Sequence, residues 1–337
     1  MNYHTVCMLI DMRSALVIGA RGVLGGLIAD VLARDGWQVR RGVRSAPERP
    51  DEALLDLERP ETLAPALDGA DLVVTTVAHP RLLVERHVLE HGGTLLSVVA
   101  LTRAETRPLA ALAPRARGTV VPNAGIMPGL TNLAAAELLR AHPDADGVEL
   151  VLTASASGTR GRAGGAFAYD NLRTRPRHRT VAIPLPAPLG RRRCIEFAEG
   201  CDGWLGDLAD GREVRSHLLL VQRLPQRGLL IANAAGMCRL LPRSQFAGER
   251  RVGAGGASRD PVAEWVAVVR DGRRLAALTV ECEGDYRGTA SAIAAFAEAA
   301  RGRDLPPGCH EPQGLFTLEQ LAPRLARDGV RIVPRHG

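Results

Sequence analysis

Lysine is absent from this 337-residue chain, and arginine supplies all 43 of its Lys and Arg side chains. A chain without lysine cannot form a lysine Schiff base, and it has no lysine for a phosphate-binding loop. It also lacks the Tyr-x-x-x-Lys pair of the short-chain dehydrogenases. The sequence therefore excludes all three of these mechanisms.

Aromatic residues, long apolar runs and closely spaced cysteines are also scarce. Aromatic residues make up 3% of the chain, so the core must be built mainly from Ala, Val, Leu and Ile. No apolar run approaches the ~20 residues that are needed to cross a bilayer. The six cysteines include no C-x-x-C pair, which predicts reduced thiols in a cytoplasmic protein and no metal site.

The N-terminus and the charge pattern argue against two further classes of protein. Residues 1–12 contain no basic segment followed by a long apolar stretch, so we expect no secretory signal, and translation could begin at Met1, Met8 or Met12. The net charge is +6, but the arginines are interleaved with acidic residues along the chain. We therefore expect a small-molecule substrate, with neither nucleic acid nor membrane as a partner.

The N-terminal third alternates short apolar runs with helical patterns. We expect helices near residues 24–35, 60–67 and 82–91, and strands at 15–18, 37–39, 53–56, 72–77, 94–99 and 119–121. Apolar strands that are separated by helices are typical of a parallel sheet buried on both faces. The pattern predicts an α/β chain in which residues 13–127 form a Rossmann-type, doubly wound parallel sheet.

The pattern changes after Pro122. A helix is expected at 130–141, followed by strand-like runs at 148–154, 217–223 and 228–232, and by a hairpin that turns at Asp271-Gly272. These elements predict an inserted, largely antiparallel α+β domain over residues 128–285, for substrate binding and dimerisation. Residues 286–337 begin with an Ala-rich helix and are expected to return to the Rossmann domain. The Gly-, Arg- and Pro-rich segment 158–193 is either an ordered substrate loop or a lid.

A glycine-rich loop follows the first expected strand and opens the first helix. Its sequence is Gly19-Ala20-Arg21-Gly22-Val23-Leu24-Gly25, a G-x-x-G-x-x-G pattern. In such a loop the first glycine allows the tight turn, the second lets the backbone approach a pyrophosphate, and the third permits close helix packing. At the first strand–helix junction of an alternating pattern, the loop predicts a dinucleotide site formed by all seven residues.

The end of the second expected strand indicates which nucleotide binds. NAD sites place an acidic residue about 20 residues after the glycines, but Val39-Arg40-Arg41-Gly42-Val43-Arg44-Ser45 contains none. Arginines pair with phosphate and stack on adenine. We predict that Arg41, Arg44 and Ser45 contact a 2′-phosphate and that NADP(H) is preferred over NAD(H). The alternative is that these are solvated loop arginines.

Later strand ends supply further candidates. Asp56 either accepts a hydrogen bond from the adenine amino group or caps the helix that follows it. Cofactor contacts are also assigned to Val77, Ala78, Val99 and Gly125. His79 follows the fourth expected strand, where the nicotinamide usually lies, and it is either catalytic or a structural hydrogen-bonding residue.

The Gly- and Arg-rich segment carries the substrate candidates. Arg160, Arg162 and Arg173 could clamp a carboxylate. Tyr169 or Asp170 could donate a proton beside a hydride transfer. The alternative for this segment is a solvated surface loop.

The segment Pro122-Asn123-Ala124-Gly125-Ile126-Met127-Pro128-Gly129-Leu130-Thr131-Asn132 resembles the exit from the nucleotide-binding domain in the saccharopine dehydrogenase/reductase-like family, which shows a G-x-D-P-G-[LVI]-[ST]-N type of sequence there. Tyr286-Arg287-Gly288-Thr289-Ala290 and Leu305-Pro306-Pro307-Gly308 resemble the family's C-terminal part. The resemblance implies a Rossmann domain interrupted by an α+β substrate domain. It also implies NAD(P)-linked redox chemistry, often at a carbon–nitrogen bond next to carboxylates.

Two departures from the family pattern bear on the substrate. Met127, which is assigned to the substrate site, replaces the family's Asp before Pro-Gly. The family's acidic, hydroxyl-bearing segment after the fifth strand is Ser97-Val98-Val99-Ala100-Leu101 here. The lysine-forming saccharopine dehydrogenases, which are thought to use a lysine, are excluded. The substrate is therefore expected to differ from saccharopine.

The main hypothesis is an NADP(H)-dependent oxidoreductase that transfers hydride to or from a small imine, amino acid or carbonyl compound. A second hypothesis is a sensor or scaffold that binds NADP(H) without turnover. A third, an atypical short-chain reductase, is disfavoured by the missing Tyr-x-x-x-Lys pair and by the long C-terminal half. Open strand edges and the family resemblance suggest a homodimer through the second domain.

Overall fold

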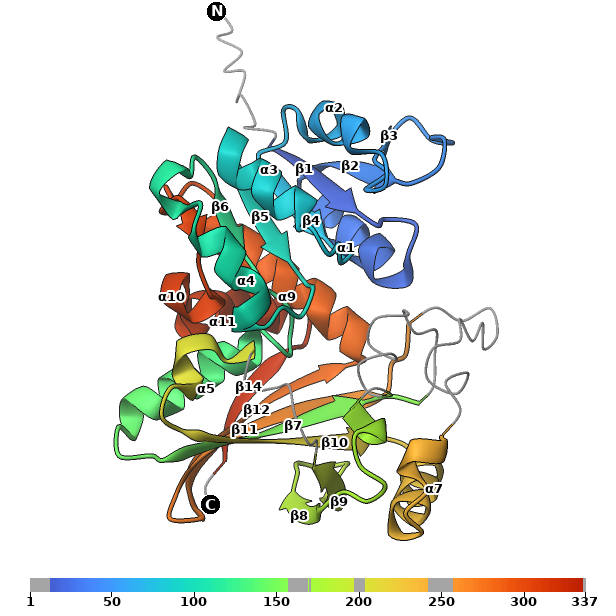
Figure 1. Ribbon diagram of the computed structural model, residues 1–337, viewed down its shortest axis with the longest axis vertical. Helices are drawn as coiled ribbons and strands as arrows, with labels where there is room; N and C mark the ends of the chain where they lie inside the picture. The colour runs from blue at the N-terminus through green and yellow to red at the C-terminus, as the bar shows by residue number, and fades with distance from the viewer. Residues whose placement is uncertain (1–12, 157–168, 170, 197–203, 242–256, 336–337) are drawn as a thin grey trace, which may run out of the picture.

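The computed structural model of the chain describes residues 13–156, 169, 171–196, 204–241 and 257–335. Two sheets lie one above the other in Figure 1, with the Rossmann-type sheet at the top. Within the described residues, the upper sheet has seven parallel strands in the order β13-β6-β5-β4-β1-β2-β3. Its strands are β1 (Ser14–Ile18), β2 (Gln38–Val43), β3 (Glu52–Leu54), β4 (Leu72–Thr75), β5 (Thr94–Ser97), β6 (Thr119–Val121) and β13 (Gly308–Cys309).

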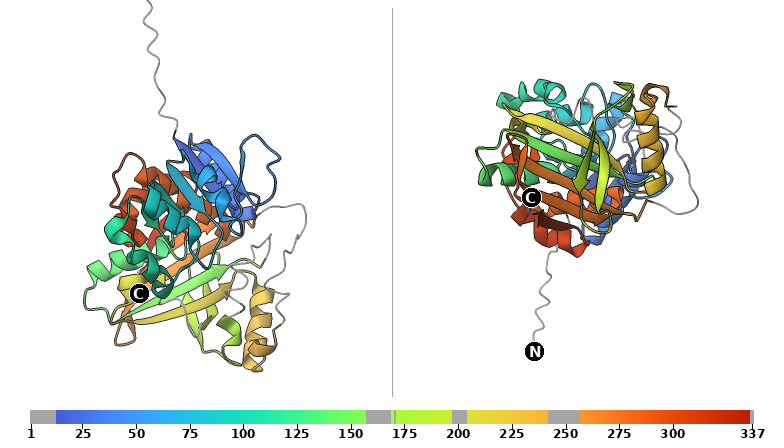
Figure 2. Two further views of the ribbon diagram at one scale, coloured as in Figure 1. Left: turned by 45° about the horizontal axis from the view of Figure 1, so that its top comes forward. Right: turned by 90° about the horizontal axis from the view of Figure 1, so that it is seen from below.

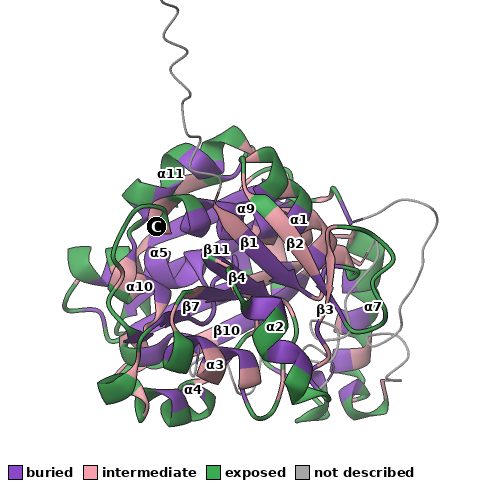
Figure 3. Cartoon of the chain, turned by 90° about the horizontal axis from the view of Figure 1, so that it is seen from above, coloured by how far each residue is buried: buried purple, intermediate pink, exposed green. Residues whose placement is uncertain are grey.

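Helices cover both faces of this first sheet. Successive residues of β1 are buried against different layers: Ala15 and Val17 belong to one apolar cluster, and Leu16 and Ile18 to another. The first layer contains α1 (Val23–Arg34) and α9 (Asp285–Ala300), and the second contains α2 (Leu63–Leu67), α3 (Leu83–His91) and α4 (Arg103–Ala110). Seen from above, the buried strands lie between these layers, as a doubly wound sheet requires (Figure 3).

The second sheet is mixed, with the order β14-β12-β11-β7-β10-β9-β8. Its strands are β7 (Gly147–Ala154), β8 (Thr180–Pro184), β9 (Arg191–Glu196), β10 (Glu213–Leu220), β11 (Pro261–Arg270), β12 (Arg273–Glu283) and β14 (Arg331–Arg335). The helix α5 (Leu130–Ala141) packs on its inner face. The outer face turns toward the viewer when the molecule is seen from below (Figure 2, right).

The C-terminal part contributes to both sheets. After β12, α9 packs against α1 of the first domain. The strand β13 then adds to the edge of the first sheet beside β6, and β14 pairs antiparallel with β12 of the second sheet. Between these strands lie the short helix α10 (Pro312–Leu315) and α11 (Leu318–Arg327).

The predicted fold class is confirmed, with three local corrections in the second domain. The run 228–232, expected to be a strand, lies inside the helix α7 (Arg223–Ala234). The segment 158–193 contains β8 and the start of β9. The domain is also less antiparallel than predicted, because β7 and β10 run parallel to each other. Among the described helices, none has the length and hydropathy to span a membrane.

Candidate nucleotide and substrate site

The glycine loop turns from the carboxyl end of β1 into α1. Gly19 has a φ of +83°, and a Cβ there would lie 2.5 Å from Oγ1 of Thr76. A Cβ on Gly25 would lie 2.3 Å from the carbonyl oxygen of Gly19. A side chain at either position would collide with neighbouring atoms, so both positions require glycine. This is expected for the first and third glycines of the loop.

Gly22 differs from these two glycines because it is exposed and forms the N-cap of α1. No side chain caps this helix, and its first turn contains no acidic residue. The first amide groups of a helix lack partners within the helix, and its N-terminus carries partial positive charge. The loop thus presents an exposed backbone and a helix N-terminus suited to an anion, which is the geometry that a pyrophosphate requires.

Arg21 ties the loop to the segment that follows β2. Its guanidinium donates to Glu52 through Nε at 3.1 Å and Nη2 at 2.7 Å, and to Oγ of Ser45 at 2.5 Å. The hydrogen bond from Arg21 is the largest of the causes that lower the pKa of Glu52 to about 2. Arg21 therefore positions Ser45 beside the glycine loop and has its own charge balanced by a carboxylate.

Arg41 and Arg44, both predicted to contact a 2′-phosphate, have different surroundings. The side chain of Arg41 is 13% exposed and is held by Asp30 at 2.6 Å and Asp51 at 3.0 Å. Two carboxylates thus balance the charge of Arg41 within the folded chain, and its contact with a 2′-phosphate stays a prediction. Arg44 is exposed and makes no hydrogen bond or ion pair with any described residue. The guanidinium of Arg44 could therefore bind a phosphate without first breaking an ion pair, and this contact also stays a prediction.

Asp56 lies in the turn after β3. Its Oδ1 accepts a hydrogen bond from the amide of Glu58 at 3.2 Å, and its carbonyl oxygen accepts one from the amide of Arg59 at 2.8 Å. These bonds close the turn that leads into the 3₁₀ helix η1 (Pro60–Thr62). The N-cap of this 3₁₀ helix is Arg59, so the side chain of Asp56 stabilises the preceding turn, and both roles considered for Asp56 stay predictions.

The residues after β4 fall into two groups. Val77 is 38% exposed, and one of its methyl groups lies 2.8 Å from the Cβ position of Gly19, so Val77 adjoins the glycine loop. Ala78 is exposed beside it. The His79 side chain is only 9% exposed: Nδ1 accepts from the amide of Arg81 at 3.3 Å, and Nε2 lies 4.0 Å from Glu58. The contacts of His79 match its structural alternative, and its catalytic role stays a prediction.

Residues 122–132, which resemble the saccharopine dehydrogenase/reductase-like family and are called the family-like segment below, lie at the carboxyl side of β6. Gly125 donates to the carbonyl of Pro128 at 3.0 Å, and the amide of Leu130 donates to the carbonyl of Gly125 at 3.0 Å. Gly129 has a φ of +132°, and a Cβ there would lie 2.1 Å from the oxygen of Gly125. Gly125 therefore forms part of a tight turn into α5. Met127, also in this turn, and Val99, two residues after β5, are both partly exposed.

A polar cluster that the sequence did not single out lies at one end of the second sheet. Oδ2 of Asp260 accepts hydrogen bonds from Ser155 at 2.6 Å, Gln222 at 2.6 Å and Ser258 at 2.7 Å. Ser155 directly follows β7, Gln222 lies two residues after β10, and Asp260 directly precedes β11. The shared position of Ser155, Gln222 and Asp260 at strand ends is the sequence signal that could have identified this cluster.

Contacts through α9 connect this cluster to the first domain. The amide of Gly284 donates to the carbonyl of Asp260 at 2.9 Å, immediately before α9 begins. One turn later, the Cβ position of Gly288 lies 2.3 Å from Cδ1 of Ile126, which belongs to the family-like segment. The first turn of α9 thus connects the polar cluster to the segment that follows β6, at the edge where ligands of open α/β sheets bind.

The predicted substrate residues are only partly described. Arg173 donates through Nη1 to the hydroxyl of Tyr169 at 2.7 Å and stacks on its ring at 5.2 Å. Tyr169 is buried, and Arg173 also donates to the carbonyl of Arg239 at 3.1 Å. These contacts place the pair beside the segment after α7. Arg160, Arg162 and Asp170 lie outside the described residues.

The half-buried carboxyl group of Glu311 lies between the two domains, near the end of β6. Oε2 of Glu311 accepts a hydrogen bond from Nδ2 of Asn123 at 3.3 Å. Burial raises the pKa of Glu311 to about 7, and nearby Asp207 raises it further, whereas Asn123 and Arg103 lower it. The carboxyl packs against Gly206, which has a φ of +58°. Arg103 also forms an ion pair with Asp207 across the junction at 3.0 Å.

This carboxyl makes stability depend on pH. The folded-state pKa of about 7 exceeds the ordinary value of 4.5, so the folded chain holds the proton more tightly than the unfolded chain. The associated stability is complete below about pH 4.5 and is lost as the pH rises through about 7. We expect Glu311→Gln to raise the free energy of unfolding by about 1–2 kcal/mol at about pH 8 and to change it little near pH 5.

Thermal unfolding of Glu311→Gln across this pH range tests the expectation. Glu90→Gln, on an exposed position of α3, is the matched control and should follow the wild-type curve. A Glu311→Gln curve parallel to wild type at every pH would contradict a buried, proton-binding carboxyl.

Comparison with solved structures finds the same architecture in other proteins. An apo saccharopine dehydrogenase (L-Glu forming) from Saccharomyces cerevisiae superimposes with a TM-score of 0.62 at 12% identity, covering 96% of this chain and 99% of that chain. A meso-dapdh mutant with DAP from Clostridium tetani gives a TM-score of 0.48 at 12% identity, covering 93% and 96% of the two chains. Neither a family model nor a curated protein matches the sequence.

The similarity to the yeast enzyme extends over both domains. It confirms at the level of the fold the family resemblance found in the segment 122–132 and in the C-terminal part. The chain therefore has the fold of saccharopine dehydrogenase, a nucleotide-binding domain interrupted by a mixed α/β domain.

Proposed function

We propose that the protein is an NAD(P)-dependent oxidoreductase that prefers NADP(H) and acts on a small imine, amino acid or carbonyl compound. The observation that carries the proposal is the geometry of the glycine loop, in which Gly19 and Gly25 pack tightly and Gly22 is exposed at the N-terminus of α1. The shared fold of the yeast saccharopine dehydrogenase supports the reaction class.

In this proposal the pyrophosphate binds at Gly22 and at the N-terminus of α1. Arg44 and Ser45 face the 2′-phosphate, and Val77 and Ala78 adjoin the loop on the side of β4. The nicotinamide then extends toward Val99 and Gly125, at the carboxyl ends of β5 and β6. The bound cofactor would supply or accept the hydride, while the chain orients both reactants.

The substrate would bind between the family-like segment and the polar cluster at the end of the second sheet. Asp260, Ser155 and Gln222 offer carboxylate, hydroxyl and amide groups there. Tyr169, Asp170, Arg160, Arg162 and Arg173 remain proposed substrate and proton-transfer residues on the neighbouring segment. The specificity of such a site depends on hydrogen bonds to the polar groups of the substrate.

Titration of the purified protein with NADPH and with NADH, by calorimetry or nicotinamide fluorescence, tests the proposal. We expect NADPH to bind in the micromolar range or tighter, roughly 8 kcal/mol or more of binding free energy, and NADH to bind at least about tenfold more weakly. If neither nucleotide binds, the glycine loop has only an architectural role and the oxidoreductase proposal fails.

A nucleotide-binding protein without turnover is the second candidate. It is favoured by His79, whose nitrogens face Arg81 and Glu58 instead of an open site. Met127 also replaces the acidic residue of the family pattern. Turnover of any imine or keto acid with NADPH eliminates this candidate, whereas tight NADPH binding with no turnover across such a panel supports it.

We also propose a homodimer through the second domain. Its sheet ends in the edge strands β14 and β8 within the described residues, and unpaired strand edges are sites for pairing with another chain. Light scattering should give twice the chain mass of 35.9 kDa. A mass of one chain over the working concentration range would contradict the dimer.

A further inference from the structure

The outer face of the second sheet, opposite α5 and the Rossmann domain, contains a cavity of about 660 Å³. It lies between the β8 side of the sheet, at Val181 and Pro184–Pro186, and the hairpin of β11 and β12. Its size falls within the range of small-ligand sites, roughly 300–1,000 Å³. The nucleotide and substrate sites proposed above use none of its residues.

The lining of this cavity is strongly basic. It includes the five arginines Arg179, Arg215, Arg273, Arg274 and Arg335, and among the described lining residues Glu149 is the one carboxylate. They come from β10, β12, β14 and the residue before β8, so the fold brings the charges together from distant parts of the sequence. We call this group the arginine cavity.

Two of the five arginines are committed to carboxylates outside the lining. Arg215 forms two hydrogen bonds with Glu213, at 2.9 and 2.7 Å, and Arg335 bonds to Glu281. Arg331 also bonds to Glu281, so that carboxylate is shared between two arginines, but the guanidinium groups of Arg215 and Arg335 have donors already engaged. The donors that remain available to an anion come from the other three arginines.

Those three retain free donors. Arg274 bonds to Glu149 through Nε alone, at 2.9 Å, and its guanidinium stacks on Trp265 at 4.7 Å. Stacking orders a guanidinium without using its N–H groups, and neither Nη of Arg274 bonds to a described residue. Arg179 has one distant ion pair, 3.9 Å from Glu196, and Arg273 has no partner among the described residues.

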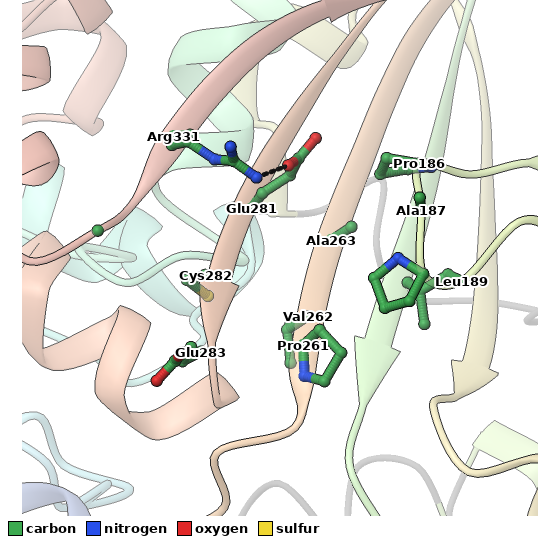
Figure 4. Close-up of a pocket in the computed structure, with 12 residues that line it drawn as sticks. Pro186, Ala187, Leu189, Pro261, Val262, Ala263, Glu281, Cys282, Glu283 and Arg331 are labelled. Carbon is green, nitrogen blue, oxygen red and sulfur yellow. Dashed lines mark hydrogen bonds and ion pairs between the residues drawn. The ribbon is translucent and has the colours of Figure 1, made fainter.

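A second cavity on the same sheet provides a contrast. It measures about 230 Å³ and is lined by Glu281, Glu283 and Arg331, with Arg331 already bonded to Glu281 at 2.9 Å (Figure 4). Two carboxylates and one neutralised arginine do not favour an anion. Excess positive charge is therefore a property of the arginine cavity rather than of this whole face.

We infer that the arginine cavity binds a small oxyanion with two or more negative charges, such as a phosphorylated or polycarboxylate metabolite. Planar guanidinium groups match the oxygen pairs of phosphate and carboxylate. Arg273, Arg179 and the Nη groups of Arg274 supply the donors. The site lies on the opposite face of the sheet from the nucleotide, so its occupancy does not depend on the proposed redox function.

Calorimetry of the whole protein with pyrophosphate and, separately, with citrate tests the inference. NADP⁺ is added in excess to fill the glycine loop, which could itself bind pyrophosphate. We expect one anion per chain, binding that weakens as salt is added, and an affinity about five- to tenfold lower in Arg273→Ala. Arg270→Ala is the matched control, because Arg270 lies on the same hairpin and pairs with Asp144, outside the cavity.

Three outcomes would overturn the inference. The first is no binding of either anion, and the second is an equal loss in Arg273→Ala and Arg270→Ala, which would indicate a diffuse charge effect. The third is a change from dimer to monomer in Arg273→Ala without any anion binding, which would assign this face to contact between chains. If NADP⁺ itself fails to bind, anion binding that is lost in Arg273→Ala but kept in Arg270→Ala still supports the cavity.

Discussion

Replacing Gly25 with alanine should remove NADPH binding and destabilise the protein, whereas the same replacement at the adjacent Gly26 should do neither. A Cβ at Gly25 would lie 2.3 Å from the carbonyl oxygen of Gly19 and 3.0 Å from Cα of Ala20. Both obstacles are backbone atoms, so α1 must move away from the loop. Overpacking of this kind costs about 2–3 kcal/mol, and it displaces the amide groups that would face the pyrophosphate.

Gly26 is a matched control one residue further along α1. A Cβ there meets only the carbonyl oxygen of Ala20, at 3.4 Å. Alanine is favoured over glycine inside a helix by about 1 kcal/mol, so Gly26→Ala should keep or slightly raise the melting temperature. Thermal unfolding and NADPH fluorescence of the two variants give the comparison. Equal NADPH affinity in Gly25→Ala and wild type would show that the loop does not hold the nucleotide.

Local sequence signals predicted the elements whose structure is determined locally. The strand–loop–helix unit around Gly19 follows from an apolar run, a glycine pattern and helical spacing. The hairpin of β11 and β12 follows from Asp271 and Gly272, which have φ values of +48° and +72° in the turn. Positive φ at both central turn positions is what Asp-Gly favours between strands. In these segments the backbone requirement and the residue type coincide.

The helix α7 shows where such signals fail. The run 228–232 is short and apolar, and periodicity alone cannot distinguish a strand from a buried helical turn in such a run. Tertiary contacts decide the outcome: the side chain of Gln226 accepts from the amide of Leu220 and donates to the carbonyl of Arg193, at 2.9 and 2.7 Å. These contacts join α7 to β10 and β9, and no local sequence pattern predicts them.

The candidate site likewise combines features that the local sequence predicts with features that depend on tertiary contacts. Its glycines could be identified from spacing, but the different surroundings of Arg41 and Arg44 depend on Asp30 and Asp51, which approach Arg41 only in the folded chain. Glu311 and Asn123 are 188 residues apart in sequence and meet because β13 adds beside β6. The raised pKa of Glu311 is thus a property of the fold.

Removing the Arg44 side chain should weaken NADPH binding about 10- to 100-fold and leave NADH binding unchanged. Arg44 directly follows β2, is exposed, and has no carboxylate partner among the described residues. Its guanidinium can therefore bond to a 2′-phosphate without first breaking an ion pair. A charge-assisted hydrogen bond of this kind contributes about 1.5–3 kcal/mol, and each 1.4 kcal/mol corresponds to a factor of about ten.

The comparison uses Arg44→Ala and Arg115→Ala, each titrated with NADPH and NADH. Arg115 is an exposed arginine in the 3₁₀ helix η2 (Ala113–Arg115), before β6 and thus at the opposite end of the strands. Arg115→Ala removes the same charge and should leave both affinities unchanged. If Arg44→Ala weakens NADPH and NADH equally, Arg44 contacts a part common to both nucleotides, such as the adenine. If it weakens neither, the 2′-phosphate is not recognised at the end of β2, and the preference for NADP(H) loses its structural basis.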